Sequence, residues 1–185
     1  HQWEDGVTRK AVHLFDSRPV YRGWRGGGRA SLTAGANPAG GVTLKYWLRD
    51  LPEDEVVLLH IQDSAGNTVQ TWSSKPDEDK DEQKLNIESG MNSLNWNLRF
   101  QGAETFDGMV LWGGGTQGPL AVPGTWKAVL TVGEETRESE FEVRGDPRLE
   151  VTADEYRQQF DFLIGIRDKL TETHEAIRKI RDVRN

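Results

Sequence analysis

The chain has 185 residues, with 35% hydrophobic and 29% charged residues, a net charge of −7 and no cysteine. Seven Trp, six Phe and three Tyr indicate a folded chain whose length fits one domain, or one domain with an appendage. The negative charge repels phosphate backbones, so we predict no nucleic-acid partner. Without cysteine the chain forms no disulfides, and no apolar run reaches the roughly 18 residues that predict a membrane span.

The first 40 residues contain little periodic pattern. We predict an N-terminal tail over residues 1–10, then a short apolar stretch and a Gly/Arg-rich loop that ends at Asn37-Pro38. Residues 21–29 resemble an RGG segment, in which arginines pair with phosphates and stack on bases. A single copy in an acidic chain favours a loop over the edge of the folded domain.

Residues 41–145 alternate between period-2 runs and turn clusters. Val42, Leu44, Tyr46 and Leu48 share one face of an extended run, whereas Trp47 falls on the other. Further strands are predicted at 56–62, 68–73, 94–99, 125–132 and 137–143, with turns at 63–67 and at Gly133-Glu134. This pattern predicts a mainly β domain over residues 11–148, an antiparallel β-sandwich of the immunoglobulin or fibronectin-III kind.

Residues 149–185 change to helical periodicity and predict one long C-terminal amphipathic α-helix. Thr152 and Glu155 form a capping-box pattern at its start. A heptad-like seam runs along it, made of Tyr156, Gln159, Leu163, Ile166, Leu170, Thr173, Ile177 and Ile180, with Phe160 and Ile164 beside it.

One small sandwich cannot cover an apolar seam of this length. We therefore predict a helix interface formed by Leu163, Ile166, Leu170, Ile177 and Ile180. Its partner would be a second copy of the chain, most simply in a two-fold dimer, or the remainder of a longer parent chain. The rival expectation is that the helix folds back onto the sandwich with its end frayed.

No constellation of residues predicts catalysis. The four histidines lack ligand-like spacing, no Gly-x-Ser-x-Gly elbow is present, and the acidic run at 75–82 lacks the spacing of a calcium loop. We predict no catalytic, cofactor-binding or metal-binding residues, and no cofactor.

Tryptophan is the compositional excess of this chain. Trp96 and Trp126 lie in strand-like runs and are predicted to be core, whereas Trp47 and Trp72 are placed on an outer sheet face. Trp24 and Trp112 lie in Gly-rich loops, where an exposed indole could stack on a sugar ring. These two residues are the candidate carbohydrate contacts.

Several short motifs occur in an order that resembles a known family. They are His13-Leu14-Phe15, Tyr21-Arg22, Asn37-Pro38, Ile61–Asn67, Gly90-Met91-Asn92, Trp96–Arg99, Gly118–Trp126 and Phe141–Arg148. The chain is similar over nearly its whole length, roughly residues 11–184, to the C-terminal region of bacterial sortilin-like BNR-repeat β-propeller proteins, often labelled glycosyl-hydrolase-like. Similar members carry Asp at position 97 and Tyr at position 126, and both replacements are compatible with the fold.

The resemblance implies an accessory module from a larger exported protein, periplasmic or extracellular, whose substrate chemistry would lie in the propeller. It also implies a second helix beyond Asn185 that packs on the seam. Because the chain begins at His1 rather than Met, we expect it to be an excised piece of something longer. The predicted function is thus a non-catalytic interaction module, and the alternative is a carbohydrate-binding module.

Overall fold

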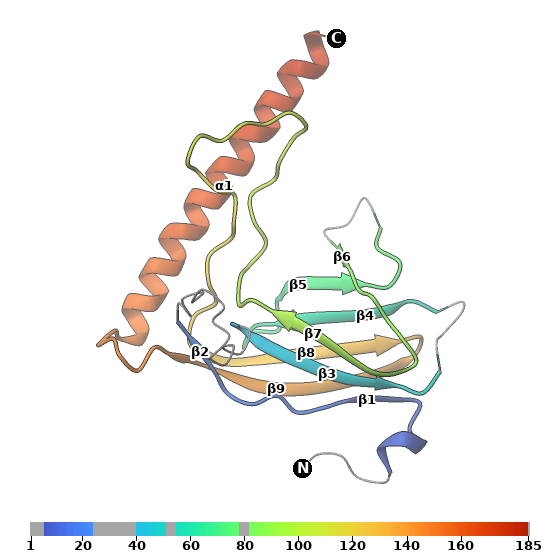
Figure 1. The fold of residues 1–185 in the computed structure, drawn as a ribbon. Coiled ribbons are helices and arrows are strands. Elements are labelled where there is room, and N and C mark those ends of the chain that lie inside the picture. The colour runs from blue at the N-terminus through green and yellow to red at the C-terminus, as the bar shows by residue number, and fades with distance from the viewer. Residues whose placement is uncertain (1–5, 24–39, 51–54, 78–81, 185) are drawn as a thin grey trace, which may run out of the picture.

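The computed structural model describes residues 6–23, 40–50, 55–77 and 82–184. In this part of the chain, two β-sheets are followed by one long helix, α1 (Ala153–Arg184) (Figure 1). A short 3-10 turn, η1 (Val7–Arg9), precedes the strands. The smaller sheet has the order β1 (Val12–Leu14), β3 (Val42–Leu48), β7 (Gly90–Trp96). The larger sheet has the order β2 (Val20–Arg22), β9 (Glu135–Gly145), β8 (Gly124–Val132), β4 (Val57–Gln62), β5 (Thr68–Ser73), β6 (Glu82–Lys84). The predicted mainly β sandwich with a C-terminal helix is confirmed.

The core lies between the two sheets. Alternate residues of β3 are buried, as the sequence pattern predicts: Val42, Leu44, Tyr46 and Leu48. The indole of Trp96 lies 5.4 Å from that of Trp126 and 6.2 Å from the ring of Phe141, measured between ring centroids. These contacts join β7 of one sheet to β8 and β9 of the other, so aromatic rings close the sandwich at this end.

Turn chemistry sets the register of both predicted hairpins. The carboxylate of Asp63 accepts hydrogen bonds from the backbone N–H groups of Ala65 and Asn67, which fixes the β4–β5 turn. Gly133 has a φ of 56° and begins the two-residue turn between β8 and β9, where Val132 pairs with Glu135.

Three features of the sheets differ from the prediction. The strand expected at 94–99 is β7 at Gly90–Trp96, because Leu98 has a positive φ of 63° and the chain leaves the sheet. Trp72 is buried in the core, so its placement on an outer face is wrong; β4 and β5 shift register beside Gln62. The short edge strands β2 and β6 pair parallel with β9 and β5, whereas the pairings inside the larger sheet are antiparallel.

The helix rises from one edge of the sandwich as an arm, and the long connection between β7 and β8 runs beside it (Figure 1). The capping box is confirmed, since the Glu155 carboxylate accepts from the Thr152 N–H at 2.8 Å and the Thr152 hydroxyl accepts from the Glu155 N–H at 3.3 Å. The 32 residues of α1 make a helix about 48 Å long at 1.5 Å per residue. Most of that length lies beyond the sheets.

Candidate interaction surface on the C-terminal helix

The base of α1 is anchored to the edge of the larger sheet. Tyr156 is buried, and the guanidinium of Arg22 lies over its ring at 4.6 Å from the centroid. Arg22 Nη2 also donates a 2.7 Å hydrogen bond to Gln159 Oε1. One turn further along, Phe160 packs on Phe100 with centroids 4.7 Å apart. The first two turns are therefore continuous with the sandwich.

The middle of α1 is held by the connection between β7 and β8. The backbone N–H of Glu104 donates to Thr171 Oγ1 at 3.1 Å, and its carbonyl accepts a hydrogen bond from His174 Nδ1. Because a carbonyl can only accept, this bond requires the proton on Nδ1. The ring of Phe106 contacts His174 edge-on and lies under the Arg181 guanidinium. This segment covers one side of the arm.

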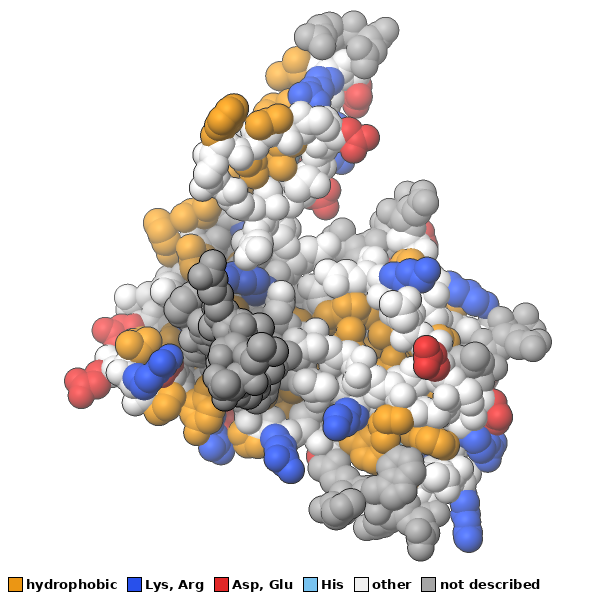
Figure 2. Space-filling view, viewed as in Figure 1, with side chains coloured by type: hydrophobic (Ala, Val, Ile, Leu, Met, Phe, Trp, Pro, Cys, Tyr) orange, Lys and Arg blue, Asp and Glu red, His pale blue; other side chains and the backbone are white. Residues whose placement is uncertain are grey.

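An apolar row runs along α1 beside the covered face. We call this row the outward stripe; it consists of Phe162, Leu163, Ile166, Leu170, Ile177 and Ile180. Phe162 is 71% exposed and Ile180 68% exposed, and Leu170 and Ile177 are half-buried. Figure 2 shows hydrophobic side chains along the arm.

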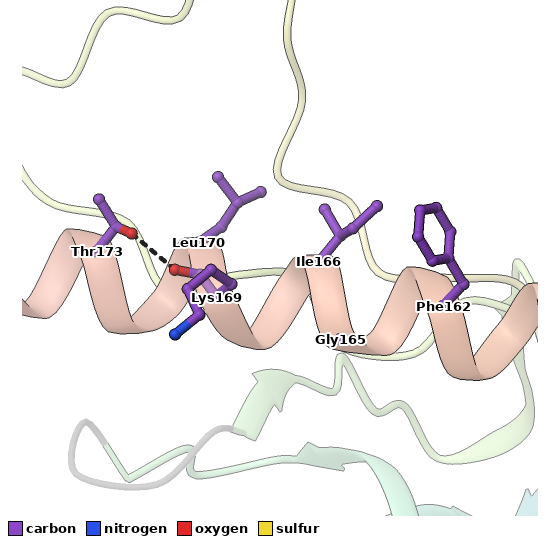
Figure 3. Close-up of a pocket in the computed structure, with 6 residues that line it drawn as sticks. All are labelled: Phe162, Gly165, Ile166, Lys169, Leu170 and Thr173. Carbon is purple, nitrogen blue, oxygen red and sulfur yellow. Dashed lines mark hydrogen bonds between the residues drawn. The ribbon is translucent and has the colours of Figure 1, made fainter.

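A shallow groove of about 440 Å³ lies on this stripe around Gly165. Phe162, Ile166, Leu170 and Thr173 all point to the same side of the helix there (Figure 3). Gly165 has no side chain to fill the space between Phe162 and Lys169, so the stripe has an open notch at this position.

Charge is unevenly distributed along α1. Asp154, Glu155 and Asp161 lie in its first half, and Arg178, Lys179 and Arg181 in its last turns. Arg178 lies 3.3 Å from the Glu104 carboxylate, and Arg181 donates to the Asp107 carbonyl. This polarity complements the helix dipole.

The structure places all five predicted interface residues on one helix face, and none of them is fully buried. Tyr156, the first residue of the predicted seam, turns into the sandwich instead. Phe162 was missed, although its spacing of four from Ile166 is a helical signal. The contacts of Glu104 and Phe106 with α1 were also missed. The sequence did contain a signal for them, because the unassigned stretch before β8 has more than 20 residues and is too long for an ordinary connection.

Of the two candidate carbohydrate contacts, the structure describes only Trp112. Trp112 is 95% exposed, beside exposed Val110 and Leu111, in the connection between β7 and β8. Trp24 lies outside the described residues. The side chain of Trp112 therefore stands in solvent as predicted, but the structure offers no second described indole beside it.

No family model matches this chain, and neither does any curated protein. The resemblance to sortilin-like proteins thus stays a prediction. Within the described residues, no helix combines the length and the apolar character that crossing a membrane requires.

Proposed function

We propose that this chain is a non-catalytic interaction module in which a sandwich of the immunoglobulin or fibronectin-III kind carries a helical arm for self-association. The observation that carries the proposal is the outward stripe, an apolar row left in solvent next to a face that the chain does cover. The resemblance adds its context, an accessory part of a larger exported glycosyl-hydrolase-like protein.

A second copy of the chain can cover the stripe, because apolar residues of the stripe meet one another when two copies of α1 pack antiparallel. Leu163, Leu170 and Ile177 are spaced by seven residues. A two-fold axis at Leu170 sets this residue against its own copy and Leu163 against Ile177 of an antiparallel helix. The same arrangement sets the acidic first half of one arm beside the basic end of the other.

The free energy available from the stripe favours a specific dimer. Burying one Leu or Ile side chain contributes roughly 1.5–3 kcal/mol, less for Leu170 and Ile177, which are already half-buried. Thr173 interrupts the apolar row, and a polar residue at such a position fixes register at a cost in stability.

Sedimentation equilibrium of the chain at tens of micromolar tests this proposal. We expect a dimer mass for the unsubstituted chain and a monomer mass for Ile166→Asp plus Ile180→Asp. Both side chains are exposed, so the double variant should fold. The matched control is Arg157→Asp on the other exposed side of α1, which changes the net charge by the same amount and should remain a dimer. A monomer mass for the unsubstituted chain would contradict self-association and leave the remainder of a longer chain as the occupant.

Carbohydrate binding is a second candidate because the Trp112 indole is almost fully exposed. An indole face stacks on the apolar face of a sugar ring, and such a platform needs the exposure that Trp112 has. Its test is a glycan array with the unsubstituted chain, Trp112→Ala and the neighbouring control Val110→Ala. Binding that disappears only in Trp112→Ala supports this function, and binding that persists in Trp112→Ala contradicts it.

A further inference from the structure

A second cavity lies where the base of α1 meets the edge of the larger sheet. Its volume is about 630 Å³, within the range of small-molecule sites. Arg22 at the end of β2 lines it, together with the segment between β9 and α1 and the first turns of the helix. This cavity is separate from the outward stripe.

Arg22 brings an uncompensated charge to this cavity. Its side chain is only 7% exposed, and its guanidinium has the bond to Gln159 and the ring of Tyr156 as partners. Among the described residues, no carboxylate forms an ion pair with Arg22, and its Nε has no hydrogen-bond partner. Burying a charge without a counter-ion is costly, so an anion at this guanidinium would be stabilised.

The carboxylates that line the cavity are already engaged. Asp146 accepts from Arg148 Nε at 2.8 Å and from the Arg148 backbone N–H at 3.0 Å, and these bonds lower the pKa of Asp146 to about 2. Glu155 is held by Thr152 in the capping box. Burial lowers the pKa of Arg22, the Tyr156 hydroxyl opposes this, and the charge of Arg99 lowers it further. Asp146 and Arg148 neutralise each other, and Glu155 bonds to uncharged groups of Thr152, so Arg22 is the lining cation that has no carboxylate bonded to it.

Part of the cavity rim is apolar. Leu149 is 58% exposed and Val151 is also exposed, and Leu120 lies half-buried beside them. Exposed aliphatic side chains next to a buried cation suit a ligand with an apolar body and an acidic group. An inorganic anion would use the cation but leave these side chains in water.

We propose that this cavity binds a small organic carboxylate, with the carboxylate on the Arg22 guanidinium and the apolar group against Leu149 and Val151. Charge-assisted hydrogen bonds between guanidinium and carboxylate are the strong kind in proteins and give the site its preference for acids. The carboxylate can come from a free carboxylic acid or from the C-terminus of a peptide, and the chemistry at Arg22 is the same for both.

NMR titration of the full chain tests the proposal with four probes: 3-phenylpropionate, N-acetylphenylalanine and the neutral amide of each. We expect saturable shifts near Arg22 and Tyr156 with the acids, and affinity about tenfold weaker for the amides, which lack the charge. Tighter binding of N-acetylphenylalanine than of phenylpropionate assigns the site to peptide C-termini, and equal or weaker binding assigns it to free acids.

Two variants keep the proposal falsifiable. Arg22→Gln should lose the preference for acids, whereas the control Arg144→Gln, an exposed arginine on neighbouring β9, should keep it. Where Arg22→Gln fails to fold, Leu149→Asp changes an exposed side chain and should weaken acid binding by charge repulsion. Equal affinity for acids and amides, acid binding that survives in a folded Arg22→Gln, or no saturation at about 10 mM probe would overturn the proposal.

Discussion

The sandwich and the arm treat similar apolar side chains differently. In the sandwich, two sheets enclose Leu44, Tyr46 and Trp96 from both sides, so these side chains are removed from water by the chain itself. In the arm, one side of α1 is covered by residues of the β7–β8 connection, while Phe162 and Ile180 remain in solvent. The apolar side chains of the sandwich are thus covered by the chain itself, whereas α1 is covered on one side and has an apolar row beside that covered face that lacks a packing partner among the described residues.

The largest expected effect comes from Trp96 in the sandwich, compared with Phe162 on the arm. Trp96→Ala should lower the free energy of unfolding by about 3–5 kcal/mol, because it removes a buried indole that contacts Trp126 and Phe141. Phe162→Ala should change it by no more than about 0.5 kcal/mol in the monomer, since the ring is exposed. Urea unfolding at a concentration too low for association measures both. A large loss in Phe162→Ala would show that the stripe is covered within one chain.

An intermediate effect is expected where the two regions meet, at Gly118. A Cβ at this position would lie 2.2 Å from the Phe100 carbonyl oxygen and 2.3 Å from that of Gln101. Gly118→Ala should therefore cost about 1–3 kcal/mol and loosen the connection that holds α1. Gly114→Ala, in the same connection but with open space around its Cβ, is the matched control and should be neutral. Thermal unfolding and hydrogen exchange of the α1 amides measure the difference, and equal behaviour of the two variants would contradict this account of the junction.

The smallest effect concerns pH and the outer face of the sandwich. Burial lowers the pKa of His60 on β4 from its ordinary value of 6.5, with Glu138 opposing the shift. The unfolded chain then takes up a proton at this residue before the folded chain does. The stabilising contribution of neutral His60 should be fully present above about pH 6.5 and be lost as pH falls below that value through the lower pKa of the folded chain.

The urea unfolding midpoint is measured between pH 7.5 and pH 5 for the unsubstituted chain and for His60→Gln. The comparison separates the contribution of His60 from the contributions of the other histidines. The difference between the two curves should change with pH in this window. A constant difference between the two curves across this pH range would show that His60, on the outer face of the larger sheet, is as exposed to solvent as the arm.

Local patterns were enough to predict β3, the β4–β5 hairpin and the start of α1, but not the short strands β1, β2 and β6. The alternation of β3, the Asp63 turn and the Thr152–Glu155 capping box each depend on residues a few positions apart, and all three form as predicted. The length of β7 and the inward direction of Trp72 were not predictable in the same way. Both depend on how a strand meets its neighbour, which the period of one strand does not contain.

The sequence by itself determined which residues of α1 share a face, because helical periodicity is a property of the chain alone. Only the tertiary structure decided which face is covered, since the β7–β8 connection has no periodic pattern and reaches Thr171 and His174 from 67 and 70 residues away. The same holds for Arg22, Tyr156 and Gln159. Nothing local marks them as neighbours, and they meet because β2 joins the edge of β9 next to the point where the helix begins.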